Sequence, residues 1–188
     1  MMLVYNKEKL MFKRKMIISL FVVLLASMTG ILILLFANPF SKEINLSKEA
    51  FILITDESVE SSTTINIRGT VHNPLLKASY FEGEIEIESL DSTMNNSVVM
   101  LVQEKVKGLN YSSFFYGQTF DQGNVLMFFT DDFSEINLLM RDVKISNNTI
   151  DFIQVVAPAS DEVSAQSVFE RMQALYPDMP SSKDLDNL

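Results

Sequence analysis

The chain has 188 residues, of which 47% are hydrophobic, and this is enough to build one hydrophobic core. Its net charge of −9 at pH 7 would repel a phosphate backbone, so we do not expect it to bind nucleic acid. It has no cysteine and one histidine. This composition excludes a disulfide-stapled domain and any zinc site built from several cysteines or histidines.

A run of 22 uncharged residues, 16–37, reads MIISLFVVLLASMTGILILLFA. As a helix it would span about 33 Å, which is enough to cross the hydrocarbon core of a bilayer. We therefore expect a single-pass transmembrane signal-anchor helix over residues 16–37, with the lipid bilayer as its surroundings.

The charges beside this run predict its orientation. Five basic residues precede it, and two follow within the next eleven positions, at Lys42 and Lys48. The basic residues before the run are Lys7, Lys9, Lys13, Arg14 and Lys15. The positive-inside rule then predicts a short basic cytoplasmic segment, 1–15, and an extracytoplasmic remainder on the outer side of the plasma membrane.

A cleaved signal peptide is the alternative reading of the same run. Signal peptides usually have an apolar region of about 7–15 residues and a small-x-small cleavage site. This run is longer, and Leu35 stands where a small residue belongs. The sequence favours an uncleaved anchor but leaves cleavage open. A translocated domain without cysteine favours a bacterial cell envelope over a eukaryotic secretory route.

The first strands follow a predicted linker, 38–48, at the start of a β-rich domain expected over 49–176. Phe51 to Ile54 is a short apolar strand candidate. Apolar and polar residues alternate over 64–72 and again over 81–88, which predicts two half-buried antiparallel strands. Asn73 and Pro74 predict the turn between them.

Two later segments are apolar at successive positions and predict central strands covered on both faces: 98–102 and 125–129. Residues 133–140 fit either a strand or a helix, and we favour the strand. Asn147 and Asn148 predict a tight hairpin turn. The turn would pair Ile145 with Ile150, Lys144 with Asp151 and Val143 with Phe152.

A C-terminal helix is predicted after Pro158. Ser160 or Asp161 is its expected N-cap, and Pro177 ends it. Its apolar stripe consists of Ala165, Val168, Phe169, Met172, Leu175 and Tyr176. Residues 177–188 are expected to be a flexible tail. The predicted fold is therefore a transmembrane helix plus an α+β domain, mainly an antiparallel sheet with one C-terminal helix.

No constellation of residues predicts catalysis, a cofactor or a metal. His72 precedes the Asn73-Pro74 turn and is expected to be an exposed turn residue. Four glutamates alternate along one strand, too far apart to close on one calcium ion, and predict a solvated face. They are Glu82, Glu84, Glu86 and Glu88. Asp131 and Asp132 follow a strand and are expected in a turn or at a helix cap.

One aromatic stretch offers a possible contact for a ligand or a partner. It comprises Tyr111, Phe114, Phe115 and Tyr116. Aromatic residues are enriched at interfaces and in ligand pockets, but we favour core packing as the explanation of this stretch.

Together these features favour a non-catalytic, membrane-anchored binding or accessory module of the cell envelope. Its small-molecule ligand stays unknown, and an envelope protein is a possible partner. Two alternatives stay open. One is a cell-envelope hydrolase, and the other is a membrane sensor or regulator that transmits through the single helix.

Overall fold

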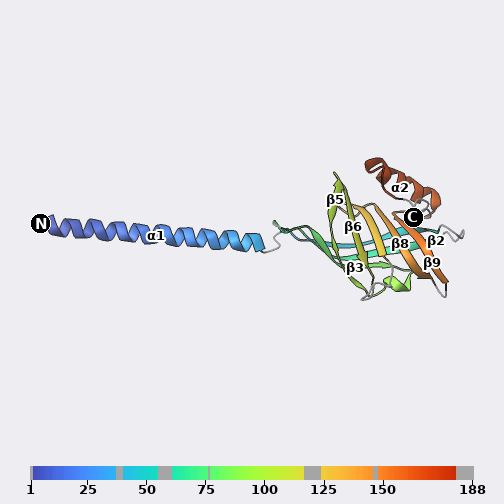
Figure 1. Cartoon of the computed structure of the whole chain (residues 1–188), viewed down its shortest axis with the longest axis horizontal. Helices are drawn as coiled ribbons and strands as arrows, with labels where there is room; N and C mark the ends of the chain where they lie inside the picture. Colours follow the sequence, from blue (N-terminus) through green and yellow to red (C-terminus); the bar gives the residue numbers. More distant parts are fainter. Residues whose placement is uncertain are drawn as a thin grey trace. The chain divides into compact units, whose positions relative to one another are not determined.

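The computed structural model describes residues 2–36, 40–54, 61–75, 77–116, 124–145 and 148–180 (Figure 1). These residues form two α-helices, nine strands and one 3-10 turn. The helices are α1 (Met2–Phe36) and α2 (Glu162–Leu175), and the 3-10 turn is η1 (Asp91–Thr93). The strands are β1 (Lys42–Ile54), β2 (Ser61–His72), β3 (Tyr80–Ile87), β4 (Ser97–Leu101), β5 (Gln103–Val106), β6 (Leu109–Phe115), β7 (Asn124–Thr130), β8 (Ile136–Ile145) and β9 (Asn148–Ala157).

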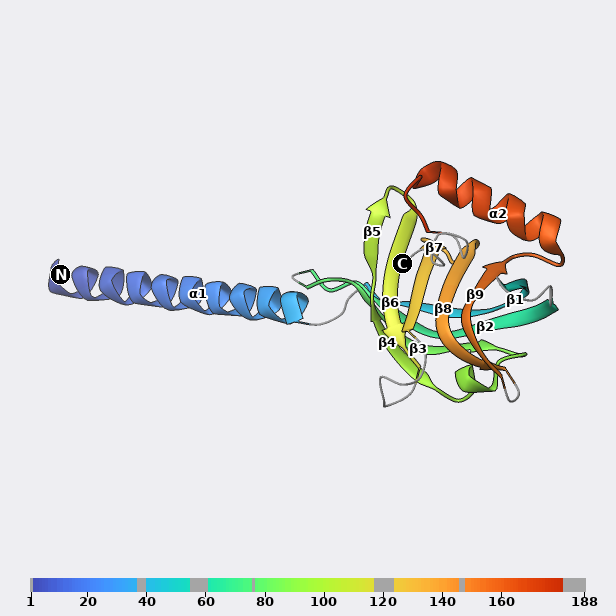
Figure 2. The same ribbon diagram turned by 45° about the vertical axis from the view of Figure 1, so that its right-hand side comes forward.

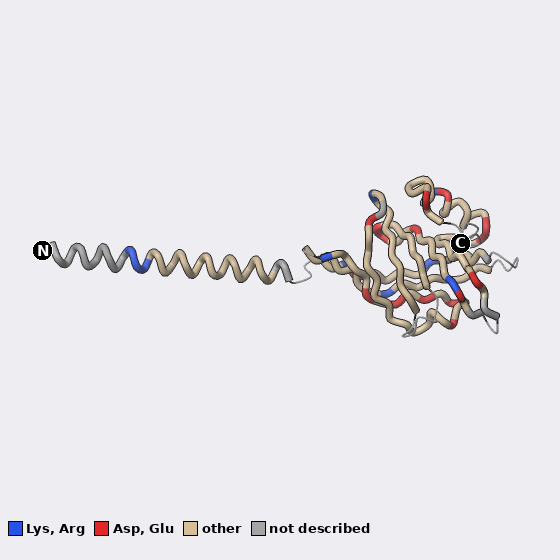
Figure 3. Tube along the Cα trace, viewed as in Figure 1, with Lys and Arg blue, Asp and Glu red and all other residues tan. Residues whose placement is uncertain are grey.

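Helix α1 contains residues 16–36 of the apolar run, and Ala37 lies outside the described residues. Its window Lys13–Ile33 has a mean hydropathy of 2.6, so by length and composition it is able to cross a membrane. A signal sequence near an N-terminus meets the same criterion. Figure 3 marks the positions of basic residues in blue at the start of this window, followed by an uncharged length of helix.

The strands form one antiparallel sheet with the order β4-β3-β2-β1-β9-β8-β7-β6-β5. Consecutive strands are neighbours within β1–β4 and within β5–β9, as in two meanders, and β1 pairs with β9 to join the two sets. Strands β4 and β5 are the two edges of the sheet. The sheet curls so that β4 comes to lie beside β6, which makes it almost a closed barrel (Figure 2). The expected antiparallel sheet with a C-terminal helix is confirmed.

The alternating strands place their apolar side chains inside the barrel. Ile65 lies opposite Ile87, and Ile67 lies opposite Ile85, all four fully buried. Arg68 lies opposite Glu84 on the outer face. Burying side chains of this size contributes about 1.5–3 kcal/mol each, so this inner face holds β2 and β3 together.

A pair of glycines lets β2 and β3 approach closely. Gly69 and Gly83 are opposite each other, and a Cβ on either would clash with a backbone carbonyl of the partner strand. The ring of Phe81 lies over both glycines and occupies the space that their side chains would otherwise take. Glycine at these positions therefore serves close packing of the barrel wall.

Helix α2 lies over the outside of the barrel (Figure 2), and a second apolar cluster fills the space between this helix and the sheet. The sheet contributes Phe51, Leu109, Phe128 and Val156, and α2 contributes Ala165, Val168, Phe169 and Met172. This confirms the predicted apolar stripe over these four positions, whereas Leu175 is 48% exposed. Met179, in the segment expected to be a tail, is buried in the same cluster. Residues 181–188 lie outside the described residues.

The N-cap of α2 is Asp161, which is one of the two residues that the sequence predicted for this position. Its carboxylate accepts a hydrogen bond from the Ser164 backbone N–H at 2.8 Å, and the Ser164 hydroxyl accepts one from the Asp161 N–H at 3.1 Å. Hydrogen bonding of the carboxylate by Ser164, first by its backbone N–H and then by its side chain, holds the pKa of Asp161 below its ordinary value.

The predicted register of the last hairpin is wrong by two residues. Val143 lies opposite Ile150, Lys144 opposite Thr149, and Ile145 opposite Asn148. A shift of two preserves the inward and outward faces of both strands, so the apolar pattern fits both registers. The expected Lys144–Asp151 pairing therefore does not occur.

Two strand boundaries and one burial expectation also differ from the sequence reading. Strand β1 begins at Lys42, inside the expected linker, because Ile44 already points into the core. Residues 136–140 form a strand, as favoured, but 131–135 form the turn before it. Strand β4 is not covered on both faces, since Val99 is 66% exposed and Leu101 is 55% exposed.

Candidate functional site

A cleft of about 360 Å³ opens at one mouth of the barrel. It is lined by the start of β1, the end of β2, the segment before β3, the junction of β4 and β5, and the two strands and turn that follow. The lining residues are Lys42, Val71, Asn73, Ser79, Val102, Glu104, Asn110, Phe129, Asp131 and Phe133. Barrel mouths are recurrent positions of ligand sites.

Aromatic side chains form the floor of the cleft. Phe133 is buried to 1% exposure, and its ring stacks on Phe129 with 4.5 Å between centroids. Phe81 packs against Phe133 from deeper in the barrel at 6.0 Å. Phe133 has a φ of 57°, a left-handed conformation that bulky residues rarely adopt. The β7–β8 turn thus holds the Phe133 ring in place at the barrel mouth, where it fills the space above Phe129.

The turn that carries Phe133 is fixed by side-chain hydrogen bonds. The Asp132 carboxylate accepts from the Ser134 N–H and from the Thr130 hydroxyl, both at 2.9 Å. The Thr130 hydroxyl also accepts from the Glu135 N–H at 3.0 Å. The bonds from Ser134 and Thr130 lower the pKa of Asp132 to about 2, so its carboxylate is ionised at neutral pH.

Charged and polar groups rim the cleft. Asn110, buried to 7% exposure, donates from Nδ2 to Asp131 Oδ1 at 2.8 Å. Lys42 supplies a cation, and Glu104 supplies a second carboxylate. The rim can therefore donate and accept hydrogen bonds and can bind either sign of charge. Among the described residues, no cluster of three His, Asp or Glu side chains is arranged to hold a metal ion.

His72 lies outside the cleft lining, on the outer face of the barrel. Its ring stacks on Tyr80 with centroids 4.5 Å apart, and Nε2 is 3.8 Å from Glu82 Oε2. The side chain is 19% exposed, so the expectation of an exposed turn residue is wrong. The stacking with Tyr80 shields it from solvent.

The four aromatic residues of the predicted contact do not lie together. Phe114 and Tyr116 are buried inside the barrel, whereas Tyr111 packs beneath α2 against Phe128. Phe115 is 42% exposed on the outside of β6. Of the four, Phe115 is therefore the one with a substantially exposed ring.

Tyr116 helps to close the barrel. Its hydroxyl donates to the Ile85 carbonyl of β3 at 2.8 Å. Burial raises the pKa of Tyr116, and the negative charge of Glu86 adds to the effect. The side chain therefore stays neutral and serves as a structural tie between β6 and β3.

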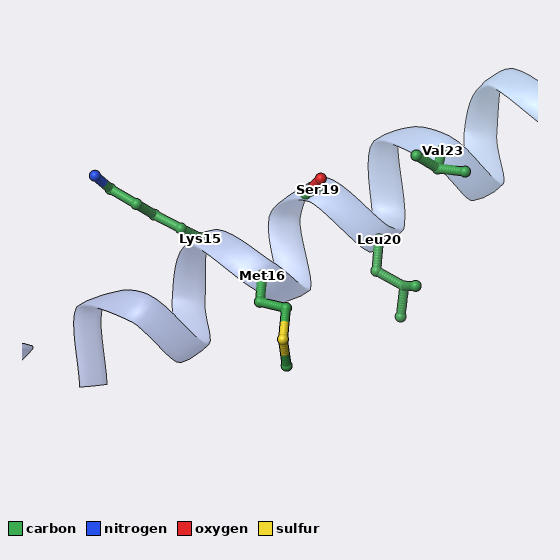
Figure 4. A pocket seen from close by; sticks show the side chains of 5 residues that line it. All are labelled: Lys15, Met16, Ser19, Leu20 and Val23. Carbon is green, nitrogen blue, oxygen red and sulfur yellow. The ribbon is translucent and has the colours of Figure 1, made fainter. Parts of the chain in front are cut away.

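A second concave surface lies on α1 and is an open groove (Figure 4). Lys15 and Ser19 lie along one side of it, and Met16 and Leu20 point the other way. All its lining residues come from successive turns of one helix. Such a groove is the ordinary surface of an apolar helix and provides no enclosed site.

Sequence reasoning missed the cleft because its residues come from six separate segments. The available signal was the set of polar residues at strand ends, such as Asn73 and Asp131, but their convergence depends on the strand order. Comparison of this chain with protein-family models, curated proteins and solved structures finds no match.

Proposed function

We propose that the protein is a membrane-anchored, extracytoplasmic binding module that recognises its ligand in the barrel-mouth cleft. The observation that carries this proposal is the combination of an aromatic floor with a polar, charged rim in one concave site. Ligand sites typically combine apolar walls with a few convergent polar groups.

The lining indicates the class of ligand. At about 360 Å³ the cleft suits a small molecule or one end of a larger one. The Asp131 and Glu104 carboxylates favour an amine, while the amides of Asn73 and Asn110 can bind hydroxyl or amide groups. We therefore expect a small amine-bearing polar molecule with an apolar part that rests on Phe133.

The anchor part of the proposal rests on α1. Its apolar window is long enough to span a bilayer, and basic residues precede it. Lys42, which lines the cleft, follows the apolar run by only five positions in the sequence. A short tether of this kind would keep the binding domain at the membrane.

The other two functions gain no specific support. The cleft lining includes Ser79 but no histidine that would activate it, so no observation favours the hydrolase. Likewise, nothing in the described residues distinguishes a sensor from a passive binding module. Both remain alternatives.

The test is ligand screening on the full-length chain in lipid nanodiscs with isotope-labelled valine methyl groups. Val71 and Val102 lie in the cleft, whereas Val163 is 79% exposed on α2 and serves as an internal reference. We expect a screen of amino acids, amino sugars and short peptides to contain a compound that shifts the methyl resonances of Val71 and Val102 but leaves those of Val163 unchanged.

Asp131→Asn should lower the affinity for that compound by roughly tenfold, because a hydrogen bond to a charged carboxylate is lost. Asp91→Asn, in η1 and outside the cleft lining, is the matched control and should leave binding intact. A compound set that shifts neither cleft valine, or that shifts Val163 equally, contradicts the assignment of the cleft.

A further inference from the structure

The outer face of β4 carries apolar side chains where a solvated strand would carry polar ones. Val99 and Leu101 are 66% and 55% exposed, while the alternate residues Val98 and Met100 are buried in the barrel. Strand β3 next to it shows the usual arrangement, with glutamates outside and apolar residues inside. The pattern of β4 is that of a strand covered on both faces.

Phe115 is a further exposed apolar side chain, on the strand that lies beside β4 where the barrel nearly closes. Strands β4 and β6 lie side by side without being hydrogen-bonded neighbours in the sheet. Phe115 points outward from β6, since Phe114 and Tyr116 on either side of it are buried. We call Val99, Leu101 and Phe115 the seam patch.

Carboxylates border the seam patch along β3. Glu82 lies directly opposite Val99, and Glu84 lies opposite Ser97. One cation, Arg68, faces Glu84 from β2, and Glu82 also lies 3.8 Å from His72. The border is acidic on balance, so the surface attracts cationic partners and repels anionic lipid headgroups.

We propose that the seam patch docks a partner protein through a segment that presents aliphatic or aromatic side chains beside lysine or arginine. The apolar residues supply the buried centre of the contact, and the glutamates select the charge of the partner at its rim. This interaction is separate from ligand binding in the cleft. It also accounts for an apolar strand face that no helix covers within the described residues.

The experiment uses the full-length chain in nanodiscs and two short peptide probes. In one peptide leucine alternates with lysine, and in the other leucine alternates with glutamate, so the apolar content is matched and the charge is opposite. Binding is measured by fluorescence anisotropy. The contact is located from methyl shifts of Val99 and Leu101, with Val163 as reference.

We expect the lysine peptide to bind, to shift Val99 and Leu101, and to lose affinity as salt is raised. The double variant Val99→Ser with Leu101→Ser should weaken it by about tenfold or more, through lost apolar burial. Glu82→Lys with Glu84→Lys should weaken it to a similar extent. Val163→Ser, an equally simple change on another exposed surface, should have no effect.

Four results would overturn the proposal. One is failure of the lysine peptide to bind, and another is binding that the seam-patch substitutions leave unchanged. The third is a concentration-dependent dimer that Val99→Ser dissociates, because the occupant would then be a second copy of the chain. Equal binding of the glutamate peptide would remove the charge selection and contradict the basic partner.

Discussion

Two outer faces of the barrel carry apolar side chains, and among the described residues a helix covers one of them. Beneath α2, Phe128 and Val156 are buried to 2% and 0% exposure. At the seam patch, Val99 and Leu101 remain more than half exposed. Strands β7 and β4 showed the same pattern in the sequence, with apolar residues on both faces. Such a pattern predicts that a strand is covered, but not which molecule covers it.

The largest expected difference between the two faces comes from removing one phenylalanine from each. Phe128→Ala should destabilise the fold by about 3–5 kcal/mol, because it leaves a cavity between the sheet and α2. Phe115→Ala, with the same loss of atoms, should cost less than about 1 kcal/mol, since its ring is 42% exposed. Urea unfolding of the full-length chain, followed by circular dichroism, measures both. Equal losses would mean that Phe115 is a structural residue and would remove it from the docking surface.

The inner packing of the wall that carries the seam patch is tested at the glycine pair. Gly69→Ala should destabilise the domain by about 1–3 kcal/mol, because the added Cβ would clash with the Glu82 carbonyl and the Phe81 ring. Thr70→Ala, at the adjacent outward position, should change the free energy of unfolding by roughly 0.5 kcal/mol or less. If Gly69→Ala is neutral in the same unfolding assay, then the close approach of β2 and β3 is not a requirement of the fold.

A smaller effect is expected where α2 contacts the β7–β8 turn. Arg171 donates from Nε and Nη2 to one Glu135 oxygen at 2.8 and 2.7 Å, and its side chain is 53% exposed. A double-mutant cycle with Arg171→Met and Glu135→Gln should give a coupling free energy of about 0.5–1 kcal/mol. A coupling free energy of zero would show that apolar packing alone holds α2 on the sheet.

The smallest expected effect is a pH dependence from Asp132. Its pKa is lowered from 3.8 to about 2 in the folded chain, so its hydrogen bonds stabilise the fold above pH 3.8. This contribution is lost as pH falls from 3.8 towards 2, and because the group is exposed it should stay below about 1 kcal/mol. Urea midpoints should therefore fall less steeply in this window for Asp132→Asn than for the unchanged chain. If the urea midpoints of the two proteins fall in parallel with pH, then Asp132 is not the source of the pH dependence.

The sequence predicted the features that depend on local periodicity. The pairing of β2 with β3 followed from alternation, and the start of α2 followed from Asp161, one of the two predicted capping residues. Local periodicity could not predict features that depend on which strands pair and in which register. The hairpin register failed because both candidate registers keep Val143 opposite an apolar residue, and the plausible Lys144–Asp151 pair favoured the wrong one.

The candidate site was harder to predict than the fold. Asn110 and Asp131 are 21 positions apart and meet because β6 and β7 are paired. The left-handed Phe133 carries no sequence signal, since phenylalanine is not a residue that favours positive φ. The aromatic stretch, in contrast, was visible in the sequence, but alternation along β6 sends Tyr111 and Phe114 to opposite faces of the sheet.

The most direct test of a membrane-anchored outer domain uses the absence of cysteine in the chain. Single cysteines introduced as Lys7→Cys and Val163→Cys are treated in intact cells with a thiol reagent that does not cross membranes. The account predicts that the protein fractionates with membranes, that Val163→Cys is labelled at once, and that Lys7→Cys is labelled only after permeabilisation. Labelling of Lys7→Cys in intact cells, or protection of Val163→Cys until the cells are opened, would contradict it.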